Sequence, residues 1–210
     1  MTKADASPVD TPGVGGSALR SAHFVTGGEG GVACWYSEGG IVPAAAKDDL
    51  LAFHRVISAF FRTGAVVPFR FPTTLADVAA LTTWLQANAA SVGRELERLS
   101  GMVQMELHIT ATKPSAAATG GREYLEARRD AQSALREAAA TARQRVGELA
   151  ADWRERETRE GLRCYALVAR GNEREFTQKV NGEAARGATI RVTGPWPPAE
   201  FLDPRLTTPS

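Results

Sequence analysis

The stretch Met102-Val103-Gln104-Met105-Glu106-Leu107-His108-Ile109-Thr110 alternates apolar and polar side chains from Val103 onward. Successive side chains of a β-strand point to opposite faces of the sheet, so this alternation is typical of a strand with one buried face. The predicted buried side consists of Val103, Met105, Leu107 and Ile109. An apolar sheet face must be covered by another layer, so helices are expected on either side of this stretch in the sequence.

The neighbouring segments predict an α+β fold around this strand. A helix is predicted from Thr73 or Thr74 to about Leu99, with Gly101 ending it, and a long helix is predicted over residues 122–157, where Ala, Arg and Glu dominate and proline is absent. A strand at 162–170, a helix at 173–185 and a strand at 188–193 follow. This order approximates a ferredoxin-like split βαβ arrangement, with helices covering one face of an antiparallel sheet.

The long helix carries an apolar repeat of eleven residues. Ala131, Leu135 and Ala138 recur as Ala142, Val146 and Leu149, and Trp153 begins a third set. Because an eleven-residue repeat keeps an apolar seam almost straight, it favours one arm of a helical hairpin or coiled coil, paired with residues 75–99. A solvated amphipathic helix lying on a sheet fits the same pattern.

Residues 19–73 predict a smaller α+β part at the N-terminal side. Two β-prone runs, 19–26 and 32–37, flank a glycine-rich loop and predict a hairpin, and apolar residues at helical spacing predict a helix over 48–61. The apolar run 65–71 predicts a strand that ends in prolines. The predicted organisation is a disordered segment 1–18, an N-terminal part 19–73, a C-terminal part 74–201 and a tail 202–210.

Composition describes an ordinary globular protein. Hydrophobic residues make up 43% of the 210 residues, and the formal net charge is +1, so nucleic acid is not an expected partner. No apolar run approaches the length needed to cross a bilayer, and residues 1–18 lack the apolar core of a secretory signal, so a membrane partner is not expected either. Cys34 and Cys164 stand alone in apolar contexts, which predicts buried free thiols in a cytoplasmic protein.

The residue types that carry catalysis do not gather in a recognisable motif. His23, His54 and His108 fall in three different predicted elements without metal-ligand spacing. No nucleophile motif occurs, and the glycine-rich loop at 27–31 leads into a strand instead of the helix N-terminus that a phosphate loop requires. We therefore predict no catalytic, cofactor-binding or metal-binding residues and no enzymatic activity.

Two segments combine proline with aromatic residues. In Thr193-Gly194-Pro195-Trp196-Pro197-Pro198-Ala199-Glu200-Phe201, three prolines surround a tryptophan, so the segment is stiff; it either ends a strand and covers the edge of the core or presents its aromatic side chains to a partner. Arg70 is the charged residue of the apolar run 65–73. Its guanidinium either points outward or bridges to a carboxylate of the chain, or it recognises an acidic group of a partner.

Four segments together resemble the GvpL/GvpF family of gas vesicle proteins. The closing segment 193–201 is similar to the family's Thr-Gly-Pro-Trp-Pro-Pro signature, and residues 65–73 resemble its strand with Pro, Arg and a Phe-Gly-Thr ending, with Pro72 in place of the glycine. Residues 121–128 resemble its Gly-x-x-Tyr-Leu entry into a long charged helix, and 162–170 lies where its next strand falls. The segments occur in the family's order over residues 50–201, although 103–109 lacks the Glu-Trp pair common in the family.

The resemblance implies a two-part α+β architecture and a non-enzymatic accessory or minor structural protein of gas vesicle assembly, located in the cytoplasm and at the gas vesicle. Such a protein would bind the small hydrophobic major shell protein, and other gas vesicle accessory proteins, and would support shell incorporation or prevent aggregation. Arg70, Trp196 and Phe201 are the predicted partner contacts. The alternatives are a small-molecule-binding or catalytic ferredoxin-like domain, and self-association through the long helix.

Overall fold

The computed structural model describes residues 23–27, 32–37, 46–112, 121–181 and 187–208, and these divide between two compact units. Unit 1 comprises Met1–Ser100 together with Leu202–Ser210, and unit 2 comprises Gly101–Phe201. The predicted boundary at residue 73 falls inside unit 1, and the predicted tail 202–210 groups with that unit. The predicted disordered segment 1–18 lies outside the described residues.

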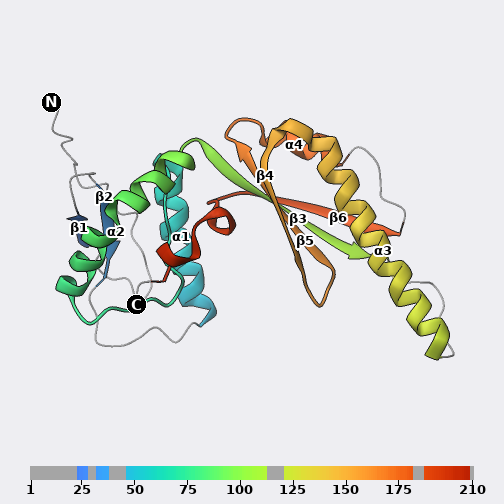
Figure 1. The fold of residues 1–210 in the computed structure, drawn as a ribbon, viewed down its shortest axis with the longest axis horizontal. Helices are drawn as coiled ribbons and strands as arrows, with labels where there is room; N and C mark the ends of the chain where they lie inside the picture. Colours follow the sequence, from blue (N-terminus) through green and yellow to red (C-terminus); the bar gives the residue numbers. More distant parts are fainter. Residues whose placement is uncertain (1–22, 28–31, 38–45, 113–120, 182–186, 209–210) are drawn as a thin grey trace. The chain divides into compact units, whose positions relative to one another are not determined.

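Unit 1 contains a hairpin and two long helices (Figure 1). The antiparallel strands β1 (His23–Gly27) and β2 (Val32–Tyr36) pair with each other, and α1 (Lys47–Thr63) and α2 (Val78–Arg98) follow, as predicted. The prediction of a strand over 65–71 is wrong, because residues 65–70 are assigned to no strand. Pro68 and Pro72 lack an N–H and cannot donate to a ladder, which accounts for the absence of pairing at these positions.

The core of unit 1 is closed by residues from the far end of the chain. Val32 of β2 and Leu81, Leu85 and Val92 of α2 form one buried cluster with Leu206, which belongs to the 3-10 turn η3 (Pro204–Leu206). The backbone N–H of Arg70 donates to the carbonyl oxygen of Thr207 at 2.8 Å. Residues more than a hundred positions apart in the sequence therefore share this core.

Helix α2 begins later than its sequence suggested. Its N-cap is Asp77, and not the predicted Thr73 or Thr74. The Asp77 side chain accepts a hydrogen bond from the backbone N–H of Ala80 at 2.8 Å. Aspartate satisfies an orphan N–H of the first turn and carries a negative charge toward the positive end of the helix dipole. The predicted end is confirmed, since Gly101 follows the helix with a φ of 70°.

Unit 2 has the element order strand, helix, strand, strand, helix, strand (Figure 1). The elements are β3 (Met102–Ala111), α3 (Gly121–Val146), β4 (Ala150–Glu157), β5 (Leu162–Ala169), α4 (Glu173–Val180) and β6 (Ala188–Trp196), with short 3-10 turns η1 (Gly147–Leu149) and η2 (Ala199–Phe201). The sheet order is β4-β5-β3-β6, and each neighbouring pair is antiparallel. The fold is a mixture of helices and antiparallel sheet.

Strand β3 lies between β5 and β6 and has the predicted alternation. Val103, Met105, Leu107 and Ile109 are all buried. Directly opposite residues of an antiparallel pair point to the same face, and the partners of Val103, Met105 and Leu107 on β5 are the buried Val168, Ala166 and Cys164. Helices α3 and α4 pack on the sheet, α3 through Ala138, Ala142 and Val146 and α4 through Phe176 and Val180.

The predicted helix 122–157 is shorter than expected. It ends at Val146, and β4 occupies Ala150–Glu157, so Trp153 lies on a strand. Gly147 follows the helix with a φ of 49°, in the left-handed region that favours glycine and ends helices. Within unit 2, α3 contacts β3, β4, β5, β6, α4 and η1, and the pairing of the long helix with residues 75–99 stays a prediction. The alternative of an amphipathic helix on a sheet is confirmed.

The placement of Leu206 predicts that the C-terminal turn stabilises a core built largely from residues before position 100. We expect Leu206→Ala to lower the free energy of unfolding of unit 1 by about 2–5 kcal/mol, because the substitution leaves a cavity between β2 and α2. Hydrogen exchange of the α2 amides should accelerate accordingly. The control is Leu125→Ala, which removes an exposed side chain of α3 and should change stability by less than about 1 kcal/mol. Unchanged exchange in α2 would contradict the prediction.

Candidate interaction surfaces

The proline-rich segment leaves the sheet at the end of β6. Trp196 is still paired with Gln104 of β3, after a register irregularity between Gln104 and Glu106, so the strand continues past Thr193, where it was predicted to end. Pro195 is tolerated because β6 is an edge strand of the described sheet. The Nε1–H of Trp196 donates to Thr193 Oγ1 at 3.3 Å, which holds the partly buried indole against its own strand.

The segment then returns onto the polar face of the sheet and is held there by three kinds of contact. The buried side chain of Gln104 accepts the backbone N–H of Glu200 at 3.0 Å. The Glu200 carboxylate pairs with Arg156 at 2.5 Å, and its carbonyl oxygen accepts a hydrogen bond from Arg154. The Arg154 guanidinium also lies 5.1 Å from the centre of the Phe201 ring, within cation–π range.

The structure places the three predicted partner contacts in different environments. Phe201 is 1% exposed, so its ring is part of the core of unit 2. Trp196 is partly buried in the same unit, and Arg70 is exposed in unit 1. The sequence did not predict the role of Arg154 and Arg156, which hold the segment. Residues 150–157 were predicted as part of a helix, so it was not recognised that these two arginines lie on the same face of strand β4.

Glycine 194 allows the close approach of β6 to β3. Its φ is 124°, and a Cβ at this position would lie 2.8 Å from the carbonyl oxygen of Gln104. We expect Gly194→Ala to destabilise unit 2 by roughly 1–3 kcal/mol or more, because backbone strain and a steric overlap combine. Gly171→Ala is the matched control, since its φ is 102° but a Cβ there would meet no atom within 4 Å. Thermal unfolding of the two variants measures the difference, and equal losses would contradict the role of the close approach.

The two polar anchors of the segment should differ in strength. Gln104→Leu keeps the volume but leaves the Glu200 N–H without its acceptor, which we expect to cost about 1–3 kcal/mol. Glu200→Gln removes a pair whose arginine is largely exposed, so its loss should stay within about 1 kcal/mol. Urea unfolding of both variants tests this order. A larger loss for Glu200→Gln would mean that the ion pair, and not the buried amide, holds the segment.

Unit 1 has apolar side chains that are only partly covered. Leu50 and Leu51, at the start of α1, are each 45% exposed, and Trp35 of β2 is 37% exposed. Phe60 of α1 packs on Trp35 with ring centres 4.5 Å apart, and Ala52 and Phe61 are the buried residues of α1.

Aromatic contacts link α1 to the segment that carries Arg70. Phe71 packs on Phe53 of α1 with ring centres 5.0 Å apart. Phe69 packs edge-on against Trp84 of α2 at 5.1 Å. Arg70, which lies between these two anchored phenylalanines, is therefore held beside α1.

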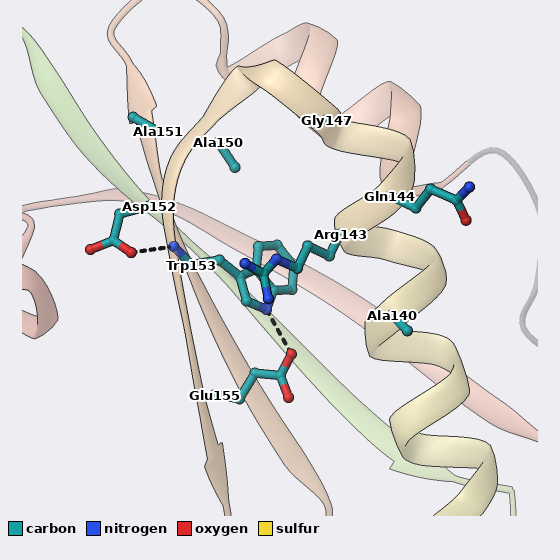
Figure 2. A pocket seen from close by; sticks show the side chains of 9 residues that line it. All are labelled: Ala140, Arg143, Gln144, Gly147, Ala150, Ala151, Asp152, Trp153 and Glu155. Carbon is teal, nitrogen blue, oxygen red and sulfur yellow. Dashed lines mark hydrogen bonds between the residues drawn. The ribbon is translucent and has the colours of Figure 1, made fainter.

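A hollow of about 600 Å³ lies in unit 2 between the end of α3 and strand β4 (Figure 2). Trp153 and Glu155 point toward α3, and Arg143 reaches into the hollow from the helix, whereas Asp152 points away (Figure 2). The Trp153 indole N–H donates to Glu155 at 2.8 Å, and the backbone N–H of Trp153 donates to Asp152 at 2.7 Å. The carboxylates of Asp152 and Glu155 therefore both accept hydrogen bonds from Trp153.

Neither cysteine is an activated nucleophile. Both are free thiols, and burial raises the pKa of Cys34 to about 11 and that of Cys164 to about 12, so both are protonated at neutral pH. Within the described ranges, no cluster of three or more His, Cys, Asp or Glu residues could hold a metal ion. The helices among these residues are too short or too polar to span a bilayer.

Comparisons with known proteins give a consistent result. The profile of the family described as gas vesicle synthesis protein GvpL/GvpF matches residues 2–203. Gas vesicle protein L from Streptomyces sp. (strain CB03234) is 28% identical, over 73% of this chain and 68% of that protein. Crystal structures of gas vesicle protein GvpF from Anabaena sp. PCC7120 and from Microcystis aeruginosa share the fold. The first has a TM-score of 0.70 at 17% identity, covering 88% of this chain and 87% of that chain. The second has a TM-score of 0.68 at 14% identity, covering 86% and 88%.

Proposed function

The chain belongs to the gas vesicle synthesis protein GvpL/GvpF family, and from this membership we propose that it is a non-enzymatic accessory protein of gas vesicle assembly. It binds the small hydrophobic major shell protein, acts together with other gas vesicle accessory proteins, and supports incorporation of the shell protein or prevents its aggregation. Its proposed location is the cytoplasm and the gas vesicle.

The partly exposed apolar side chains of unit 1 carry the proposal of shell-protein binding. A hydrophobic partner is held mainly by apolar area removed from water, and a few large side chains supply most of the binding free energy. Trp35, Leu50 and Leu51 offer such area on β2 and α1. Arg70, exposed and held beside α1 through Phe71, adds a polar contact at the margin of this surface.

The architecture of unit 2 supports a ferredoxin-like assignment as part of the same proposal. Its order of strands and helices, and the sheet order β4-β5-β3-β6 with antiparallel neighbours, are those of a split βαβ arrangement. Such folds host many functions, so this assignment says nothing by itself about activity.

Co-expression with the host's major shell protein, followed by affinity capture of this chain, tests the proposed function. We expect the shell protein to be captured and to remain in the supernatant. Leu50→Ala/Leu51→Ala should reduce capture about tenfold, because it removes two exposed apolar anchors. Arg70→Ala and Trp196→Ala should weaken capture less, and Phe201→Ala is interpretable only if its fold persists, because the ring is buried.

The matched control is Tyr124→Ala/Leu125→Ala, which removes two exposed apolar side chains from α3 in unit 2. It should leave capture unchanged. Equal losses in both double variants would mean that general surface hydrophobicity drives association. Absence of capture, with shell protein present and in solution, would contradict the proposal.

The hollow beside Trp153 is the observation that favours the second candidate, a small-molecule-binding or catalytic domain. Its lining combines one guanidinium, one indole and a few alanines, and its carboxylates are engaged by Trp153. If capture fails, a screen of small molecules by quenching of tryptophan fluorescence becomes the test, with Trp153→Phe identifying the signal of the hollow. A ligand that quenches wild type but not Arg143→Ala would favour this candidate.

A further inference from the structure

One row of side chains crosses all four strands of unit 2 and is made of three arginines and a histidine. Arg156 of β4 stands opposite Arg163 of β5, Arg163 stands opposite His108 of β3, and His108 stands opposite Arg191 of β6. Directly opposite residues in antiparallel strands point to one face, so the four side chains share a face. With strands about 4.8 Å apart, this basic row is about 14 Å long.

The basic row lies on the face that α3 and α4 leave uncovered. Its neighbours in sequence, Leu107 and Ile109 on β3 and Leu162 and Cys164 on β5, are the buried side chains of the opposite, helix-covered face. The row itself is accessible: the side chain of Arg156 is 60% exposed and that of Arg163 is 41% exposed, and Arg191 is also classed as exposed.

The carboxylates that reach the basic row within the described residues are fewer than its cations. Glu106 lies 3.2 Å from both Arg163 and His108, and Glu200 lies 2.5 Å from Arg156. The next row of side chains on the same face consists of Glu106 with Arg154, Tyr165 and Thr193. Asp152 lies in the row after that, further from the basic row. Arg156 and Arg163 stand directly opposite one another, an arrangement of like charges that their carboxylates Glu200 and Glu106 partly offset, and an anionic partner would add negative charge toward the Arg191 end of the row.

The chain's own closing segment indicates which kind of anion fits. Glu200 places a peptide-borne carboxylate on Arg156, a member of the basic row, and its backbone is held by Arg154 and Gln104 on the same face. This arrangement is a peptide segment that carries one carboxylate, in the 3-10 turn η2, and lies on the sheet face. Arginine binds carboxylates with two parallel hydrogen bonds where geometry allows, so the same chemistry is available at Arg163 and Arg191.

We propose that the basic row, beyond the part covered by Glu200, binds an acidic segment of a partner protein through Arg163 and Arg191, with His108 between them. The proposal stands independently of shell-protein binding, which was assigned to the apolar side chains of unit 1. It concerns an acidic peptide, with carboxylates on alternate residues of an extended chain about 7 Å apart on one side.

The test uses the full chain and a fluorescein-labelled peptide of seven residues, in which glutamate alternates with serine or threonine. Fluorescence anisotropy at low salt should show saturable binding that weakens as ionic strength rises. Arg163→Gln/Arg191→Gln should lower the affinity about tenfold or more, since two charge-assisted contacts are removed. Arg191→Gln alone should lower it about threefold while thermal unfolding is unchanged, because this exposed side chain can be replaced without disturbing the Glu106 pairs.

The matched control is Arg128→Gln/Arg129→Gln, which removes the same charge from exposed positions of α3 and should leave binding unchanged. Equal losses in the two double variants would overturn the proposal in favour of a general charge effect. Absence of wild-type binding would also overturn it. So would tighter binding of a single-stranded oligonucleotide with the same dependence on Arg163 and Arg191, which would assign the row to phosphate.

Discussion

The alternation of β3 is the constraint on which unit 2 depends. This strand pairs with β5 on one side and β6 on the other, so each of its side chains belongs to one of two layers. Leu107 faces the helices and Glu106 faces the charged side, and a shift of one residue would exchange these roles and bury charge. The register fixed in this way also aligns Arg156, Arg163, His108 and Arg191 in a single row.

The C-terminal residues contribute to the stability of both units. After β6, the polypeptide is fastened to the polar sheet face by Gln104, Arg154 and Arg156. It then re-enters unit 1, where Leu206 completes a core that otherwise comes from β2 and α2. The core of unit 1 therefore depends on Leu206, which is distant in the sequence from the other residues of that core.

The proposed binding role rests on the family assignment and on the surfaces that the structure describes. Cys164 is buried and Cys34 is partly buried, both thiols are protonated at neutral pH, and the carboxylates of the hollow are hydrogen-bonded to Trp153. In contrast, α1 leaves apolar side chains uncovered, and the sheet leaves a basic row uncovered. Under the two proposals, chemically different parts of the chain hold an apolar partner and an acidic one.

The amino-acid sequence by itself determined the family, the hairpin, helices α1 and α2, strands β3 and β5 and the buried side of β3, because these depend on local periodicity and on motifs. It did not determine the end of α3: eleven-residue spacing continued through Ala142 and Val146 into Trp153, although Gly147 turns the chain into an edge strand. It also left open whether Phe201 covers the edge of the core or faces a partner, whereas in the structure the Phe201 ring is buried and Arg154 and Gln104, from distant strands, hold that segment on the sheet. Only the tertiary structure revealed the basic row and, separately, the contact of Leu206 with the core of unit 1. The row depends on the register between strands, and the Leu206 contact depends on the C-terminal residues packing against unit 1, so no local sequence pattern relates the residues involved.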